Sequence, residues 1–405
     1  MRQFLWLGSF MDDMTNQVMT IKGYKNAASY LSQKNLLEGL ETVTGIVFDS
    51  ISAVAMAGYP RQGNIYIESV MFTHKAQAED VLVGYFNPLY FNKLFMRSAM
   101  IKEVKRWIQN RYKGGDLDVY IYEMRSACLA AGAQIKKQIP LAKIHLIVPD
   151  LPCFMDLNMS RVKKFLKKID WGIITSYFEY IDDFFLYTET MAGFLGMQDK
   201  KWMVVEGSIN IKDIQTITTQ CRENNKPQNE KKVIMYSGWI DKSFGIDKLI
   251  DSLSYLDNTY ELWITGVGPY ENELKRIASN DKRIKYYGFI SKREELLQLQ
   301  TNASIMLNIR DPQIEAAHYC FPSKLFEYML LGIPVLTVNL RGIPTEYKQF
   351  LYEIDVFNSK QIAHSIQKVM NDPRRFEKAI AGKRFIIDEK NNLTVAKKII
   401  RFLEE

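Results

Sequence analysis

Residues 321–336 have the sequence FPSKLFEYMLLGIPVL, which predicts a short helix followed by a buried strand. The Pro-Ser pair is typical of a helix start, because a missing N–H costs nothing there and the Ser323 hydroxyl can cap a free donor. Gly332 is expected to end the helix, and the apolar residues beyond it to form the strand. Lys324 and Glu327 fall beside free backbone N–H groups that attract phosphate, although a glutamate there can simply favour the helix dipole.

Strands and helices alternate upstream of this stretch. Strands are expected at 232–238, 260–268, 284–289 and 304–309, with helices between them at 244–250, 270–278 and 293–300. Such alternation predicts an α/β domain whose parallel sheet is covered on both faces, with ligands beyond the carboxyl ends of the strands. The residues expected near those ends are Gly238, Gly266, Gly268, Gly288, Arg310 and Lys324. A single glycine is more often a turn device, so the prediction rests on their order and spacing.

Residues 233–346 resemble the donor half of family-four glycosyltransferases, which have the two-domain GT-B fold. The segments that carry the resemblance are the Gly238 turn leading into Gly245-Ile246, the Gly266-Val267-Gly268 loop, Gly288-Phe289, the 322–334 helix and RGIPTE at 341–346. The resemblance implies two Rossmann-like domains with a nucleotide-activated sugar bound between them. The acceptor-binding domain is expected at 1–207 and the donor-binding domain at 208–384, with a helix at about 385–405 returning to the first.

The resemblance also assigns site residues. It implies that Glu327 holds the ribose hydroxyls and that Gly288 and Phe289 lie near the base. The expected donor-binding residues are Gly8, Ser9, Gly238, Gly266, Gly268, Gly288, Phe289, Arg310, Tyr319, Ser323, Leu325 and Glu327. The residues expected to take part in catalysis are Asp150, Lys324 and Lys242. Relatives need no metal, so neither a metal nor a cofactor is expected beside the nucleotide sugar.

Some positions depart from the family pattern. Trp239 and Phe244 stand where relatives usually have an arginine and a lysine for the diphosphate. Lys242 and Lys324 are the candidates to replace them as charged hydrogen-bond donors, but Lys242 can equally be an exposed loop lysine. Tyr319 replaces the family's first glutamate, so contacts to the transferred sugar do not carry over.

Other residues could supply the sugar contacts. Glu315 and His318 lie close to this position in sequence, although His318 is first taken as a structural residue. Asp150 lies where many relatives carry a His-Asp pair, with Pro149 in place of the histidine. Asp150 can contact a sugar hydroxyl or the acceptor, or it can only shape a turn. His145, inside the preceding strand, is expected to be packed.

The N-terminal half fits the same plan. Strands are expected at 4–9, 64–72, 81–86, 118–122, 143–152 (running into a loop), 184–187 and 201–207. Helices are expected at 26–40, 127–137, 189–195 and 393–405, the first of them ending at Gly39. Gly8 and Ser9 are what remains of the glycine-rich loop that faces donor phosphate and acceptor in relatives. A polar run at 218–232 marks an exposed connection near the domain boundary.

Composition agrees with this architecture. A chain of 405 residues normally forms two or more domains, and 47% hydrophobic with 24% charged residues is ordinary for a globular protein. The cysteines are Cys128, Cys153, Cys221 and Cys320. They are too far apart for a CxxC motif, so neither a zinc site nor a disulfide framework is expected. Reduced cysteines indicate a cytoplasmic location. Asp12 and Asp13 follow the first apolar residues too early for a signal peptide, and no run is long enough to span a bilayer.

The net charge of +7 is unevenly distributed. Basic residues crowd residues 93–113, and residues 161–169 place Val162, Phe165, Leu166 and Ile169 on one helical face with lysines on the other. That pattern is typical of a helix on an anionic membrane surface. It is equally typical of a helix that packs on its own core by the apolar face. Nucleic acid is a third possible partner, but no recognition motif accompanies the charge.

These observations predict a cytoplasmic glycosyltransferase of the hexosyltransferase class that uses a nucleotide sugar, with a UDP-sugar favoured, and the resemblance implies retention of the anomeric configuration. The expected acceptor is a saccharide or a lipid-linked saccharide in cell-surface polysaccharide synthesis, and the expected location extends to the inner face of the plasma membrane. A non-catalytic nucleotide-sugar binder that supports a partner transferase is the alternative, since the usual cations are replaced. Another GT-B activity, such as that of a sugar-nucleotide epimerase, is a third alternative.

Overall fold

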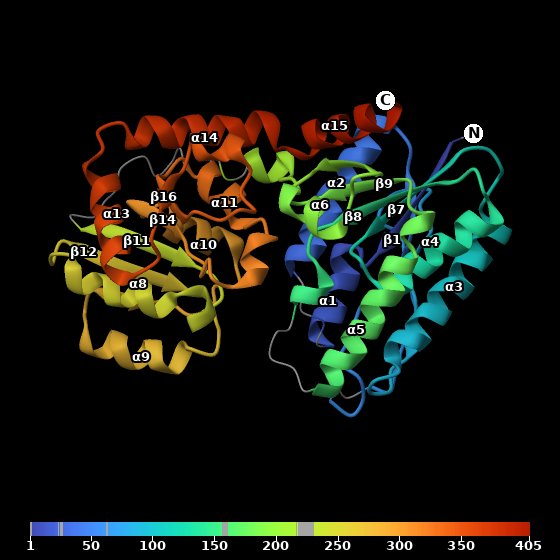
Figure 1. Ribbon diagram of the computed structural model, residues 1–405, viewed down its shortest axis with the longest axis horizontal. Coiled ribbons are helices and arrows are strands. Elements are labelled where there is room, and N and C mark those ends of the chain that lie inside the picture. Colours follow the sequence, from blue (N-terminus) through green and yellow to red (C-terminus); the bar gives the residue numbers. More distant parts are fainter. Residues whose placement is uncertain are drawn as a thin grey trace. The chain divides into compact units, whose positions relative to one another are not determined.

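The computed structural model describes residues 2–22, 24, 27–61, 64–155, 161–215, 217 and 231–405. The chain divides into two compact units, Met1–Ser208 with Asn392–Glu405 and Ile209–Asn391. Each unit has a largely parallel sheet with helices around it (Figure 1). The sequence predicted the boundary between the two domains after residue 207, which is one residue earlier. It predicted that the segment returning to the first domain starts at about 385 rather than at Asn392. Most of the polar connection expected at 218–232 lies outside the described residues.

The second unit contains a six-stranded sheet in the order β13-β12-β11-β14-β15-β16, and every pairing in it is parallel. Its strands are β11 (Lys232–Ser237), β12 (Tyr260–Thr265), β13 (Ile284–Tyr286), β14 (Ile305–Asn308), β15 (Val335–Val338) and β16 (Tyr352–Ile354). Its helices include α8 (Ile246–Ser252), α9 (Glu271–Asn280), α10 (Arg293–Gln300), α11 (Lys324–Leu330), α12 (Thr345–Lys348), α13 (Ser359–Asn371) and α14 (Arg375–Glu389). The strands β11, β12 and β13 follow one another toward one edge of the sheet, and β14, β15 and β16 follow one another toward the other edge. The strand order therefore reverses between β11 and β14.

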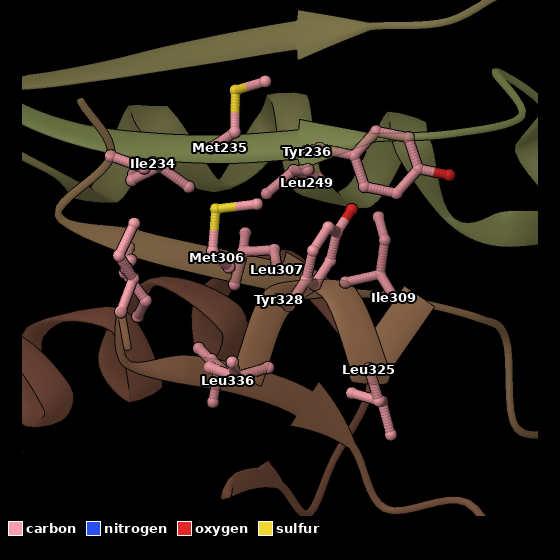
Figure 2. Packing of buried hydrophobic residues seen from close by; sticks show 14 of the residues in the cluster. Ile234, Met235, Tyr236, Leu249, Met306, Leu307, Ile309, Leu325, Tyr328 and Leu336 are labelled. Carbon is pink, nitrogen blue, oxygen red and sulfur yellow. The ribbon is translucent and has the colours of Figure 1, made fainter. Parts of the chain in front are cut away.

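The core of this unit holds α11 against the sheet. Figure 2 shows Leu325 and Tyr328 of α11 beside apolar side chains of β11, β14 and β15. Leu325 and Tyr328 are 0% and 1% exposed, so this face of α11 is fully buried. Gly332 has a φ of +73° just beyond the helix, as expected for a residue that ends one. The expected cap by Ser323 is wrong, because its backbone is helical rather than extended and its side chain makes no capping hydrogen bond.

The first unit contains an eight-stranded sheet in the order β10-β9-β8-β7-β1-β2-β5-β4, in which only β4–β5 is antiparallel among the described pairings. Its strands are β1 (Gln3–Gly8), β2 (Phe48–Ser52), β4 (Val70–Phe72), β5 (Asp80–Leu82), β7 (Leu117–Tyr122), β8 (Lys143–Val148), β9 (Asp183–Leu186) and β10 (Lys201–Val204). A small antiparallel pair joins β3 (Tyr66–Ile67) to β6 (Tyr85–Phe86). The predictions of one strand at 64–72 and one strand at 81–86 are therefore wrong, since each region divides into two strands. Gly84 lies at the second break, where an added Cβ would overlap the backbone of Ile67 and Ser69.

The helices of the first unit are α1 (Asp13–Ile21), α2 (Ala27–Thr44), α3 (Asn92–Asn110), α4 (Ser126–Gln138), α5 (Arg161–Ser176), α6 (Glu189–Leu195) and α15 (Asn392–Glu404). The prediction that α2 ends at Gly39 is wrong, because the helix continues to Thr44. An added Cβ at Gly39 would overlap the backbone oxygen of Asn392. This glycine therefore lets α15 pack closely on α2, which completes the first unit with the last described segment of the chain.

Candidate functional site

The carboxyl edge of the second unit, between β11 and β14, is the point where ligands of such sheets bind. Gly238 directly follows β11, and Arg310 lies just beyond β14. The chain then passes through a short 3-10 turn, Glu315–His318, and into α11. Three groups of residues that are far apart in sequence are thus brought to the same edge: the β11 turn, the end of β14 and the first turn of α11.

Lys324 connects two of these groups. Its ammonium donates a hydrogen bond to the carbonyl oxygen of Ser237, the last residue of β11. A Cβ on Gly238 would overlap the Lys324 Nζ, so glycine at 238 leaves room for the ammonium. Although the residue as a whole is exposed, the protein atoms around the ammonium desolvate it and lower the pKa of Lys324 to about 8, against an opposing effect of the Glu327 charge. A poorly solvated cation at this edge is suited to an anionic ligand.

Tyr328 also binds the end of β11. Its hydroxyl donates to the Ser237 carbonyl at 2.9 Å and accepts from the Ser237 N–H at 3.1 Å. The hydroxyl of Thr265, at the end of β12, donates to Ser237 Oγ at 3.0 Å. The end of β11 is therefore bound by both α11 and β12. This restraint holds the position of the Lys324 ammonium relative to the sheet.

Glu327 lies one turn further along α11 and is half-buried. Its Oε1 accepts a hydrogen bond of 2.8 Å from Nε2 of Gln300, the last residue of α10. Gln300 is 0% exposed, so its amide is a fixed donor. The sequence pattern did not indicate Gln300, because a glutamine at the end of an amphipathic helix has no motif of its own.

Gly266 and Gly268 have a structural explanation. Beyond the strand ends, the two loops continue to pair, with Gly238 N–H donating to Thr265 O and Ile240 N–H to Val267 O, each at 2.9 Å. A Cβ on Gly266 would overlap the Gly238 carbonyl, and one on Gly268 would overlap the Ile240 carbonyl. Both glycines are required by this close approach of two backbones, whether or not a ligand is near.

Arg310 lies over the ring of Phe244, with 5.1 Å between its guanidinium carbon and the ring centroid. Phe244 is one of the two residues that replace the usual cations, so a cation is present beside this position after all, supplied from the end of β14. Trp239, the other replacement, is 49% exposed. Lys242 is exposed and its ammonium lies 5.3 Å from the ring centroid of Tyr270, in a short turn capped by Asp241.

The remaining predicted donor residues lie around this edge. Gly288 has a φ of +69°, and Phe289 beside it is 69% exposed. An exposed aromatic ring at the carboxyl edge is suited to stacking on a base. Glu315 is exposed, whereas His318 and Tyr319 are half-buried directly before α11. The side chain of Leu325 is in the core, so only its backbone is available to a ligand.

In the first unit, Gly8 and Ser9 are held by Gln33 of α2. The Ser9 N–H donates to Gln33 Oε1 at 3.0 Å, and Gln33 Nε2 donates to Ser9 Oγ at 2.8 Å. A Cβ on Gly8 would overlap the same Gln33 oxygen. The polar groups of Ser9 are thus engaged within the unit, which accounts for its 1% exposure. Sequence reasoning missed Gln33, since its contact with the β1 end depends on the packing of α2.

Asp150 and His145 differ in their surroundings. Asp150 is exposed just beyond β8, and its charge helps to raise the pKa of the buried Tyr187 to about 12, an effect due mainly to burial. His145 is 2% exposed, with Nδ1 at 2.9 Å from Asp183 and Nε2 at 3.0 Å from Asp118. The prediction that His145 is packed is confirmed. Within the described ranges, no group of three or more His, Cys, Asp or Glu side chains is arranged to hold a metal ion.

Residues 218–384 match the family model described as "Glycosyl transferases group 1". The second unit is similar to group 1 glycosyl transferases. The family match and the fold together support the predicted glycosyltransferase enzyme. They do not establish membership of family four in particular. No curated protein matches the chain.

Solved structures match over the full length. HepE from Anabaena in complex with UDP has a TM-score of 0.66 at 12% identity, with 99% of each chain covered. The sucrose-phosphate synthase of Thermosynechococcus elongatus has a TM-score of 0.65 at 13% identity, covering 100% of this chain and 98% of that one. The α,α-trehalose-phosphate synthase (UDP-forming) of Burkholderia xenovorans, in complex with glucose-6-phosphate, has a TM-score of 0.68 at 7% identity, covering 99% and 100%. The expected GT-B fold is confirmed by these likenesses.

Proposed function

We propose that this protein transfers a sugar from a UDP-sugar, with retention of configuration and without a metal, to a saccharide or lipid-linked acceptor in cell-surface polysaccharide synthesis. The observation that carries the proposal is the Lys324 ammonium, which the Ser237 carbonyl holds at the point where the strand order reverses. The UDP bound in the similar HepE structure supports the choice of nucleotide. A lipid-linked acceptor would place the protein at the cytoplasmic face of the plasma membrane.

The proposed chemistry centres on the leaving diphosphate. The bond between the anomeric carbon and the diphosphate oxygen breaks, and its electron pair stays on the diphosphate. The acceptor hydroxyl oxygen bonds to that carbon, and the hydroxyl proton passes to the departing diphosphate oxygen. Lys324 stabilises the charge that grows on the diphosphate, and Arg310 and Lys242 add positive charge at the same edge. Asp150 is the proposed contact of the first unit with an acceptor or sugar hydroxyl. Glu327, fixed by Gln300, accepts hydrogen bonds from the ribose.

A thermal-shift screen of UDP-, GDP- and other nucleotide sugars tests the donor class. A ligand that binds only the folded protein raises its apparent stability by mass action. UDP-sugars are expected to raise the melting temperature more than GDP-sugars at equal concentration. A larger shift with another nucleotide would replace UDP in the proposal and leave the site unchanged.

Replacing Glu327 by alanine should weaken UDP binding about tenfold or more. The loss of a charged hydrogen-bond partner typically costs about 1.5–3 kcal/mol, and tenfold corresponds to about 1.4 kcal/mol. Calorimetric titration with UDP measures the effect. Glu294→Ala, which removes an exposed glutamate from the neighbouring α10, is the matched control and should bind like the wild type. An unchanged affinity in Glu327→Ala would remove this residue from the ribose site.

The pKa of Lys324, lowered to about 8, predicts the pH dependence of the reaction. The ammonium is charged below this pKa and neutral above it, so kcat/KM for the donor should fall about tenfold per pH unit above about pH 8. The decline in kcat should come at higher pH, because a bound diphosphate favours the charged form. In Lys324→Arg the decline of kcat/KM should disappear, since arginine stays charged. A decline that persists in this variant would belong to another group.

The non-catalytic alternative is favoured by one observation, the replacement of two usual cations by Trp239 and Phe244. Such a protein would bind UDP-sugars but release no UDP from them. Slow hydrolysis of the donor in the absence of acceptor, followed as UDP release, separates the two functions. Hydrolysis that is lost in Lys324→Ala supports the enzyme, and tight binding with no hydrolysis supports the partner role.

A further inference from the structure

Helix α5 of the first unit turns its apolar face away from its own protein. Its apolar residues Val162, Phe165, Leu166 and Ile169 are 59%, 65%, 37% and 46% exposed. They follow one another at helical spacing, so they form one continuous stripe. The interpretation that this face packs on the core is therefore wrong.

The C-terminal half of α5 makes the contacts with the unit. Ile174 is 1% exposed, and the Trp171 ring lies 5.9 Å from that of Phe194 in α6. Asp170 accepts a hydrogen bond of 2.8 Å from the hydroxyl of Ser126 at the start of α4. The helix is thus attached to the unit by residues 170–174, whereas none of residues 161–169 is buried.

Three exposed apolar residues at the start of α3 accompany this stripe. Phe91 directly precedes the helix, Leu94 and Phe95 lie in its first turn, and the three are 59%, 45% and 43% exposed. An ion pair of 2.7 Å between Lys93 and Asp170 joins the start of α3 to α5. Both helices pack on α4, and Figure 1 shows α3, α4 and α5 in the same unit. We call the seven apolar residues of α5 and α3 the α5–α3 patch.

The α5–α3 patch is accompanied by positive charge. Arg161, Lys164 and Lys168 are exposed on α5, and Lys102, Lys105 and Arg106 are exposed further along α3. Apolar side chains together with basic ones are the features of a helix that lies in the headgroup region of an anionic bilayer. A protein partner would leave the lysines without a role unless it were acidic. Among the described helices, none has the length and apolar content that crossing a bilayer requires.

We propose that the α5–α3 patch binds the surface of an anionic lipid bilayer, with its apolar side chains among the acyl-chain ends and its basic residues at the lipid phosphates. Helix α5 follows β8, and α3 runs back toward the start of β7, so both helices begin at the carboxyl edge of the sheet. This is also the edge at which Asp150 lies. If the proposed function holds, membrane binding brings this edge to the lipid-linked acceptor.

Vesicle sedimentation of the full chain tests the proposal. The wild type should pellet with vesicles of phosphatidylglycerol and phosphatidylcholine at low salt, and the pelleted fraction should fall as salt screens the attraction. Val162→Ser/Phe165→Ser/Ile169→Ser should lower the apparent affinity tenfold or more, and Lys164→Gln/Lys168→Gln should lower it on anionic vesicles. Leu141→Ser, which removes an apolar side chain that is 88% exposed elsewhere on this unit, should bind like the wild type.

The possible outcomes are separable. Circular dichroism and the affinity for UDP should be unchanged in the triple-serine variant, because its side chains are exposed and lie outside the donor unit. Wild type that stays in the supernatant with anionic vesicles at low salt would overturn the proposal, and so would triple-serine protein that still pellets fully. A dimer in analytical ultracentrifugation that is lost in this variant would instead make the patch a protein interface. Loss of vesicle binding leaves UDP affinity as an independent test of the proposed function.

Discussion

Replacing Lys324 by alanine is expected to lower the turnover of sugar transfer by about a hundredfold to a thousandfold, as the loss of one preorganised donor to a developing negative charge typically does. The ammonium is held at the end of β11 by the Ser237 carbonyl, so it is in place before the charge develops. Affinity for uridine, which lacks the diphosphate, should change little, because the interaction grows only as the diphosphate leaves. Initial rates of UDP release and calorimetry with uridine measure the two quantities.

The matched control for this variant is Lys360→Ala, which removes an exposed lysine from α13 of the same unit. Turnover in the control should equal that of the wild type. A chelator should leave the wild-type rate unchanged if no metal bridges the phosphates. Wild-type turnover in Lys324→Ala, or a rate that the chelator abolishes, would contradict the proposed role of Lys324.

Replacing Gly266 by alanine is expected to destabilise the second unit by about 3 kcal/mol, with loss of UDP binding as a consequence. The added methyl group would overlap the Gly238 carbonyl, and the φ of +128° is one that side chains other than glycine rarely adopt. The loop after β11, which begins next to the Ser237 carbonyl bound by Lys324, would have to move. Denaturant unfolding with calorimetric titration measures both effects.

The variant Gly288→Ala measures the cost of backbone strain without the steric overlap that is expected in Gly266→Ala. Gly288 also has a positive φ, +69°, but an added Cβ would meet no atom within 4 Å. Its cost should be limited to about 1 kcal/mol from the left-handed conformation. Equal costs for the two variants would show that the contact between the loops after β11 and β12 does not matter.

Much of the second unit could be predicted because local sequence and fold agree there. Its strands are short apolar runs that end near glycine, and α10 has the bounds that its periodicity predicts, 293–300. The strand β2 was missed because its sequence FDSIS does not look apolar. Asp49 and Ser50 are buried there, and Asp49 is satisfied by Trp107 Nε1 at 2.7 Å and by Arg111. Such partners come from other elements and leave no local signal.

In the candidate site, too, some features follow from the local sequence and others depend on contacts between distant elements. The positions of Lys324 and Glu327 on α11 could be predicted because the local sequence marks where this helix begins and ends, while their contacts with the donor stay predictions. The stacking of Arg310 on Phe244 and the fixing of Glu327 by Gln300 depend on which loops meet, and the strand order decides that. The outward direction of the α5 stripe could not be predicted either, because periodicity shows that a helix has an apolar face and not what that face contacts.

The packing of α15 on α2 has a consequence for biosynthesis. Domains usually fold as units in the order in which the ribosome produces them, with the N-terminal one first. Here the first unit lacks its closing helix until residues 392–405 have been made, whereas Ile209–Asn391 is a continuous segment. Until then, the α2 surface at Gly39 has no partner helix. The unit translated second therefore completes its fold first.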